Sequence, residues 1–180
     1  HAYNAGVDGL STHNHFNPPS PVFHTIGDAA SLINMDKVFA VDNLTANIRT
    51  WETACSREGR LPIELSPDVP ILINLPVGDD VALANLSMRI CLNQTSFDDR
   101  IEFKINGHML ETQVTSIAEG VSPAVRGKFI LHAKPNPTTF IQGDNQVSVF
   151  LKNHCALAAG MPVVTEIQLI VKYHSIAPGH

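Results

Sequence analysis

Arg100-Ile101-Glu102-Phe103-Lys104-Ile105 alternates charged and apolar side chains without a fault, and Asn106-Gly107 follows it at once. Successive side chains of a β-strand point to opposite faces, so this alternation predicts a strand with one face in the core and the other in water. The buried set is Ile101, Phe103 and Ile105, and the exposed set is Glu102 and Lys104. Asn106-Gly107 tolerates the positive φ angles of a tight type I′ turn, which predicts a hairpin.

Apolar runs of strand length recur throughout the second part of the chain, and turn residues separate them. These runs are Ile71 to Leu75, Leu86 to Leu92, Met109 to Thr115, Lys128 to His132, Gln146 to Lys152 and Val163 to Tyr173. Regularly spaced short strands with Gly, Pro, Asn and Asp between them are typical of antiparallel sandwiches. We therefore predict a mainly β fold, a two-sheet β-sandwich of the jelly-roll or galactose-binding-like kind, over residues 61–180.

The charge and apolar content of the chain argue against nucleic acid and membrane as partners. The chain has 12 Lys and Arg against 17 Asp and Glu, with a formal net charge of -5. Its basic residues are scattered, so no run is able to neutralise several neighbouring phosphates, and we expect no nucleic-acid partner. No apolar stretch reaches the roughly 20 residues that cross a bilayer, so we also expect no membrane span.

Residues 1–40 differ in pattern from the rest of the chain. Ala5 to Thr12 is a strand candidate, and the proline-rich stretch Asn17 to Pro21 follows it. Ala29 to Met35 is a helix candidate, because Asp28 is placed to accept the free N–H groups of its first turn and Lys37 lies beside its negative end. We predict a short βα extension over 1–40 and a linker over 41–60, with a short helix from Leu44 to Thr53.

Several of these segments resemble the end of the barrel in glycoside hydrolase family 10-like proteins of bacteria. The resemblance rests on Ala5 to Leu10, Asn14 to Phe16, Ile26 to Asp28 and Met35 to Phe39, which look like the last strand and helix of that (β/α)8 barrel. Asp79-Asp80, Asp99 to Gly107, Gln142 to Val147 and Val164 to Tyr173 are similar to the C-terminal sandwich of the same proteins.

The resemblance implies an accessory role. A barrel closes only with all its strands, so this chain does not contain a catalytic barrel. We expect the C-terminal part of a secreted carbohydrate-active protein, a noncatalytic sandwich that packs beside the missing barrel domain. The alternative is an extracellular structural or assembly subunit whose N-terminal segment pairs with a neighbouring chain. An independent hydrolase is the third hypothesis.

Three residues are candidates for contact with a carbohydrate. His15 and Asn17 would lie at the active-site rim if their strand belonged to an intact barrel. Trp51, the single tryptophan, is either a sugar platform or a residue that packs a junction. His13 and His15 share one face of a strand and form a weak alternative metal site, since two ligands fall short of the usual three or four.

The sequence contains no recognisable catalytic constellation. Asp79-Asp80 and Asp98-Asp99 are tight carboxylate pairs, but adjacent residues point in opposite directions and both pairs lie in turns, where we expect structural roles. His154-Cys155 is adjacency alone and gives no evidence of a dyad. We expect no cofactor, although the oxygen-rich turn Gly143 to Asn145 is a speculative site for a structural Ca²⁺.

Asn43, Asn85 and Asn93 begin acceptor triplets for N-glycosylation, which hints at secretion. Three cysteines, Cys55, Cys91 and Cys155, allow at most one internal disulfide. Their spacing predicts neither a zinc site nor a redox pair.

Overall fold

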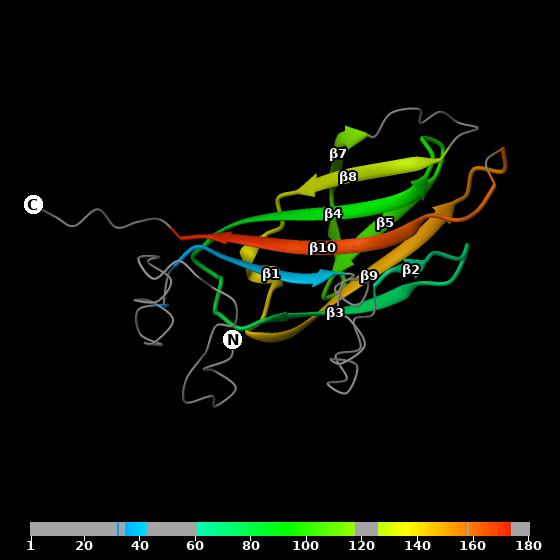
Figure 1. Ribbon diagram of the computed structural model, residues 1–180. Helices are drawn as coiled ribbons and strands as arrows, with labels where there is room; N and C mark the ends of the chain where they lie inside the picture. Colours follow the sequence, from blue (N-terminus) through cyan, green and yellow to red (C-terminus); the bar gives the residue numbers. More distant parts are fainter. Residues whose placement is uncertain (1–31, 33–34, 43–60, 118–125, 158, 174–180) are drawn as a thin grey trace, which may run out of the picture.

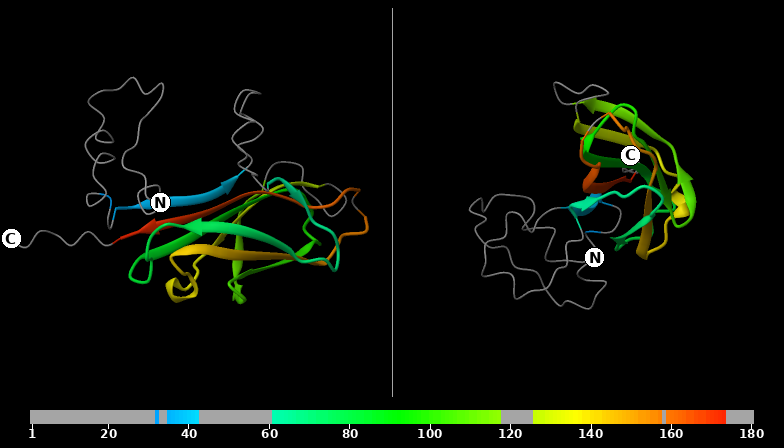
Figure 2. Two further views of the ribbon diagram at one scale, coloured as in Figure 1. Left: turned by 90° about the horizontal axis from the view of Figure 1, so that it is seen from below. Right: turned by 90° about the vertical axis from the view of Figure 1, so that its right-hand side faces the viewer.

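The computed structural model describes residues 32, 35–42, 61–117, 126–157 and 159–173. These residues form two antiparallel sheets that face each other across an apolar core, as Figures 1 and 2 show. The predicted two-sheet sandwich is therefore confirmed. The strand candidate at 5–12, the helix candidate at 29–35 except Leu32 and Met35, and the predicted helix at 44–53 lie outside the described residues.

The larger sheet has the strand order β1-β10-β4-β8-β7, and β2 also pairs with β10. Its strands are β1 (Lys37–Asp42), β2 (Ile63–Glu64), β4 (Asn85–Thr95), β7 (Thr112–Ile117), β8 (Gly127–Ala133) and β10 (Val163–Lys172). The smaller sheet has the order β3-β9-β5-β6. Its strands are β3 (Ile71–Val77), β5 (Arg100–Ile105), β6 (His108–Leu110) and β9 (Gly143–Asn153).

The core lies between the sheets and is built from alternate residues of each strand. On β10, Ile167, Leu169 and Val171 are fully buried. Phe103 and Ile105 face them from the smaller sheet, each with only 1% of its surface exposed. Burying one such side chain contributes about 1.5–3 kcal/mol to the free energy of unfolding. The period-two pattern is therefore what holds the two layers together.

Strand β5, which contains the alternating sequence Arg100–Ile105, has the predicted orientation. Ile101 packs against the core beside Phe103 and Ile105, whereas Lys104 is exposed and Glu102 is partly exposed. Asn106 and Gly107 have φ angles of 48° and 85°, as a type I′ turn requires. The hairpin that joins β5 to β6 is confirmed.

Two parts of the chain differ from the sequence prediction. The single strand expected over Met109 to Thr115 is two strands, β6 and β7, because the chain passes from the smaller to the larger sheet at Glu111. Lys37 begins β1, which pairs along its whole length with β10, so the sandwich includes a strand that crosses the predicted boundary at residue 40.

The alternation of β1 explains why it joins the sandwich. Phe39 and Val41 pack against the core, while Val38 and Ala40 are exposed. Among the described residues, no helix is long and apolar enough to cross a membrane.

Candidate functional site

The sandwich is open along one side, between β5 and β7. β6 pairs only with Phe103, Lys104 and Ile105, so the first half of β5 has no described neighbour on that edge. A cleft of about 550 Å³ opens there. It is lined by Leu92, Thr95, Ser96, Phe97, Asp99, Arg100, Ile101, Glu102, Thr112, Val114, Phe129, Leu131 and Lys152. Concave sites with a largely apolar lining and a few polar groups are the usual ligand sites of proteins.

An exposed aromatic ring stands at this cleft. Phe97, in the turn between β4 and β5, has 52% of its surface exposed. The buried ring of Phe129 meets it edge-on, with centroids 5.4 Å apart and an interplanar angle of 75°. Edge-to-face packing of this kind is favourable and fixes the direction of a ring. Phe97 is therefore a braced platform that still presents an apolar surface to solvent.

Polar groups stand around the ring. Lys152 Nζ donates a hydrogen bond of 2.7 Å to Glu102 Oε1 in a partly exposed ion pair. The side chain of Arg100, also exposed, makes no hydrogen bond or ion pair to another described residue. Arg100 and Phe97 also line a smaller depression next to the cleft, together with Asp98 and Asn153. The cleft thus combines one apolar platform with hydrogen-bonding groups of both charges.

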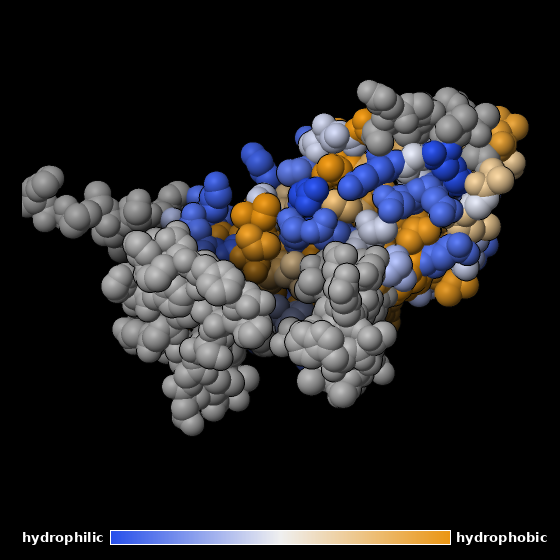
Figure 3. Space-filling model, in the orientation of Figure 1, coloured by the Kyte–Doolittle hydropathy of each residue, from blue (hydrophilic) through white to orange (hydrophobic). Residues whose placement is uncertain are grey.

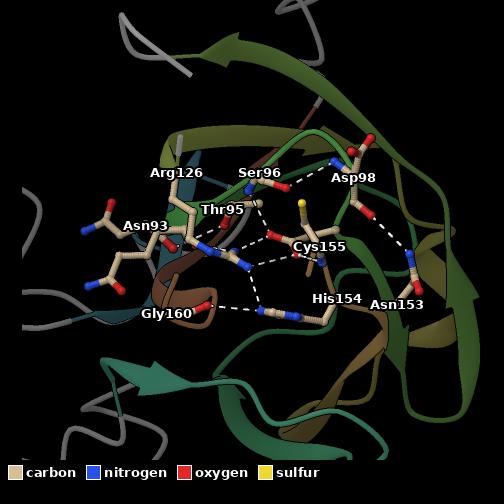
Figure 4. Close-up of polar contacts among 11 residues, drawn as sticks. Asn93, Thr95, Ser96, Asp98, Arg126, Asn153, His154, Cys155 and Gly160 are labelled. Carbon is tan, nitrogen blue, oxygen red and sulfur yellow. Dashed lines mark hydrogen bonds and ion pairs between the residues drawn. The ribbon is translucent and has the colours of Figure 1, made fainter. Parts of the chain in front are cut away.

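A buried network holds the turn that carries Phe97 (Figure 4). Arg126 Nη1 donates to Asp99 Oδ2 at 2.5 Å and to the Gln94 carbonyl oxygen at 2.7 Å. Asp99 also accepts hydrogen bonds from the backbone N–H groups of Ser96 and Cys155, at 2.8 and 2.9 Å. One carboxylate therefore ties together two connections that cross between the sheets, from β4 to β5 and from β9 to β10, at the end that we call the Arg126 end.

His154 completes this network. A guanidinium group only donates hydrogen bonds, so His154 Nε2 accepts from Arg126 Nη2 at a distance of 2.7 Å. The Gly160 carbonyl oxygen, 3.1 Å from the same Nε2, then receives no hydrogen bond from it. Cys155 is buried, and its backbone rather than its thiol contacts Asp99. Arg126 Nε is buried without a hydrogen-bond partner. The arrangement fixes the loop between β9 and β10. The contacts of the described residues do not pair the Cys155 thiol with His154 as a nucleophile with its base.

A second concavity, which we call the hollow, lies over β4, β8 and β7. It has a volume of about 650 Å³ and is lined by Ser87, Glu111, Thr112, Gln113, His132, Ala133 and Lys134. Figure 3 shows that hydrophilic residues predominate over the described surface around these strands. The hollow has no aromatic side chain. Sequence reasoning missed both concavities because their residues come from strands that are distant in the chain.

Farther along the same sheet, the ion pair of Arg89 and Glu166 shields a cysteine. Arg89 Nη1 and Cys91 Sγ both donate to Glu166 Oε2 at 3.2 Å. Burial raises the pKa of the Cys91 thiol, and its hydrogen bond to Glu166 raises that pKa further. The thiolate form is therefore disfavoured, which is typical of an inert structural cysteine.

Three of the four carboxylates in the tight pairs contact other parts of the fold, namely those of Asp79, Asp80 and Asp99. Asp79 forms an ion pair with Lys37, and Asp80 accepts a hydrogen bond of 3.0 Å from the Ala82 N–H group. Asp99 is committed to Arg126. No group of three or more His, Cys, Asp or Glu in the described part of the chain is placed to hold a metal ion. At the predicted Ca²⁺ turn, the Asn145 amide hydrogen-bonds the backbone at Ile141 and Gly143.

The predicted contact residues His15, Asn17 and Trp51 lie outside the described residues, as do the alternative metal ligand His13 and the glycosylation candidate Asn43. Asn85 and Asn93 are exposed on β4. Both asparagines therefore lie at the surface, and their glycosylation stays a prediction.

Comparisons with known proteins find similar solved structures but no matching family or curated sequence. No protein-family model and no curated protein matches the chain. Similar solved structures include two crystal structures of BuGH86, a glycoside hydrolase family 86 enzyme, in complex with neoagarooctaose, one of the wild type and one of a variant. The TM-score is 0.45 for both, with 12% and 13% sequence identity over 63% and 64% of this chain. The chain spans 18% of the length of either enzyme.

Proposed function

We propose that this chain is a noncatalytic accessory module of a secreted carbohydrate-active protein and that it contacts a carbohydrate at the cleft beside Phe97. The sequence resemblance to the C-terminal part of glycoside hydrolase family 10-like proteins supports the origin in a longer protein. The exposed acceptor residues Asn85 and Asn93 are consistent with secretion.

The braced, half-exposed ring of Phe97 carries the proposal. A sugar ring has an apolar face and a rim of hydroxyl groups, so it fits a site with an aromatic platform beside hydrogen-bond donors and acceptors. Phe97 supplies the platform. Arg100 and Lys152 supply donors, and the Glu102 carboxylate supplies an acceptor.

The carboxylates of the cleft support a noncatalytic role. Hydrolysis of a glycoside commonly requires two carboxyl groups on opposite sides of the scissile bond. Of the two that line the cleft, Asp99 is fully buried and bound to Arg126. Only Glu102 reaches solvent, and it is paired with Lys152. The lining of the cleft therefore offers one solvent-reaching carboxylate where the reaction needs two.

The alternative role in assembly would use the open strand edges at the cleft. Both edges carry features that discourage pairing with another chain. β7 has a bulge between Val114 and Ser116, and the open part of β5 carries Arg100 and Glu102. A small-molecule or polymer ligand therefore fits this side of the sandwich better than an added strand.

Binding to a glycan array tests the proposal, with Phe97→Ala as the site variant and Met109→Ala as the matched control. Met109 is also an exposed apolar side chain, but it lies on β6 and does not line the cleft. We expect Phe97→Ala to weaken binding about tenfold, because aromatic contacts contribute about 0.5–1.5 kcal/mol and 1.4 kcal/mol is tenfold. Binding that Phe97→Ala leaves unchanged, or no binding to any glycan, would reject the cleft as a sugar site.

An assay for released reducing sugar tests the noncatalytic part. We expect the purified chain to release none from any polysaccharide that it binds. Reproducible hydrolysis that Glu102→Gln abolishes would assign an enzyme instead.

A further inference from the structure

The hollow gathers several polar side chains that are uncommitted in one concavity. No hydrogen bond or ion pair joins the side chains of Ser87, Glu111, Thr112, Gln113, His132 or Lys134 to another described residue. Some other polar side chains do engage one another, as in the ion pairs Arg89–Glu166 and Lys152–Glu102. The hollow therefore gathers donors and acceptors that are available to a ligand.

Their positions follow from strand register. His132 on β8 lies directly opposite Gln113 on β7. Ala133 lies opposite Met88 on β4, which brings Lys134 beside Ser87. Three neighbouring strands thus present their outward side chains to one place, which is rigid because all three strands belong to one hydrogen-bonded sheet.

The hollow and the cleft meet at one residue. Thr112, the first residue of β7, lines both concavities. β7 is an edge strand, so a flexible polymer is able to pass from the cleft across the start of this strand into the hollow. We propose that the hollow is a second subsite for the same carbohydrate chain, and that the ligand is an extended polysaccharide rather than a mono- or disaccharide.

The chemistry of the hollow selects the class of polysaccharide. Glu111 and Lys134 carry opposite charges, and Gln113, Ser87 and Thr112 each donate and accept hydrogen bonds. Such a set matches hydroxyl groups, which also donate and accept. Repulsion from the Glu111 carboxylate would offset the attraction of an anionic polymer to Lys134. The hollow therefore gives an anionic chain no net electrostatic advantage. The hollow therefore fits a neutral polysaccharide.

This inference rests on the proposed sugar contact at Phe97, and chain length distinguishes the two. The probes are cello-, xylo-, manno-, laminari- and neoagaro-oligosaccharides, each as a disaccharide and as an octasaccharide, measured by calorimetry. We expect the octasaccharide of the bound series to bind at least about tenfold more tightly than its disaccharide, as a few additional hydrogen bonds would give.

The double variant Gln113→Ala/His132→Ala should remove this length effect and leave disaccharide affinity unchanged. Both side chains are exposed and unbonded, so the substitutions should leave the fold intact. Gln146→Ala, an exposed glutamine on β9 of the other sheet, is the matched control and should keep the length effect.

Each other outcome has a definite meaning. Phe97-dependent binding with equal affinity for short and long chains would overturn the second subsite and leave the cleft proposal standing. A length effect that survives in the double variant, or that Gln146→Ala removes equally, would also overturn it. Tighter binding of polygalacturonate than of every neutral series would overturn the neutral class. If no oligosaccharide binds, both proposals fall together.

Discussion

An ion pair closes each end of the sandwich, but the two pairs differ in burial. At the Arg126 end, the side chains of Arg126 and Asp99 are 6% and 0% exposed. At the opposite end, which we call the Lys37 end, Lys37 and Asp79 are 20% and 17% exposed. Removing one partner of a buried pair leaves a charge without compensation, whereas water screens a more exposed one. The same chemistry therefore has unequal consequences at the two ends.

The surroundings increase the contrast. Asp99 also accepts two backbone hydrogen bonds, so its carboxylate holds main chain as well as a side chain. At the Lys37 end, Asp79 accepts from the Tyr173 hydroxyl at 3.3 Å, and Lys37 Nζ lies 5.7 Å from the centre of the Tyr173 ring. The Tyr173 hydroxyl also reaches the Asp80 carbonyl oxygen at 3.1 Å. The Lys37 end is thus mainly a side-chain cluster with one backbone contact, while the Arg126 end organises the loops that frame the cleft.

The largest predicted effect is at the Arg126 end. Arg126→Met should lower the free energy of unfolding by about 3–5 kcal/mol, because Asp99 would keep a buried charge without its partner. Urea denaturation measures the loss. Arg100→Met is the control, since Arg100 is exposed and unpaired, and it should change stability by no more than about 0.5 kcal/mol. A loss below about 1 kcal/mol for Arg126→Met would remove the contrast between the ends.

A buried amide should come next in size. Asn145 is fully buried and accepts hydrogen bonds from Asn106 Nδ2 at 2.8 Å and from the Ile141 N–H group at 2.9 Å. Asn145→Ala leaves these donors unsatisfied and should cost about 1–3 kcal/mol in urea denaturation. Asn74→Ala on β3, where the amide is exposed and bonds Asp144, is the control and should cost less. Equal losses would show that burial of the amide does not matter.

The ion pair at the Lys37 end should have a small effect. Lys37→Ala should lower the free energy of unfolding by about 0.2–1 kcal/mol, and high salt should reduce the difference between variant and wild type. A double-mutant cycle with Asp79→Asn isolates the pair. A coupling energy as large as that between Arg126 and Asp99 would contradict the proposed difference between the ends.

The smallest effect is confined to alkaline pH. Burial raises the pKa of Tyr173 to about 12, and the negative charge of Asp79 adds to the shift. The folded state thus holds this proton more tightly than the unfolded state, whose pKa is near 10. The resulting stabilisation is full below pH 10 and is lost as the pH rises toward 12. Tyr173→Phe should show a shallower alkaline loss of stability than wild type, and parallel curves would refute the assignment.

Local patterns allowed the fold class to be predicted. The alternation around Phe103 gave the strand, its buried face and the following turn, because strand geometry depends on neighbouring residues alone. β1 was missed because a short apolar segment after a helix signal is ambiguous in period. Its place in the sheet comes from pairing with Val171 and its neighbours, more than a hundred residues away. The break at Glu111 was missed for the same reason, since only the packing of two sheets requires it.

The candidate site was less predictable than the fold. Phe97 is an unremarked turn residue in the sequence, and its importance depends on Phe129 and on the gap left beside the short strand β6. The pairing of Asp99 with Arg126 joins residues 27 positions apart. The sequence did indicate that the Asp pairs are structural, because Asp in a turn bonds the nearby backbone, and the structure bears this out for Asp80 and Asp99.

The pairing of β1 with β10 determines how this module can be connected to other proteins. Lys37 lies opposite Val171, so the strand that begins the sandwich and the strand that ends it share one end of the molecule. Arg100 pairs with Asn153 at the other end, close to Phe97 in the lining of one depression. A fusion partner joined before β1 or after β10 therefore attaches on the side remote from Phe97. A ligand bound at Phe97 would then lie away from the attached protein, whereas the hollow, where Ser87 lies opposite Ile170, would be nearer to it. Tandem copies would gain avidity at Phe97 only through linkers long enough to span that separation.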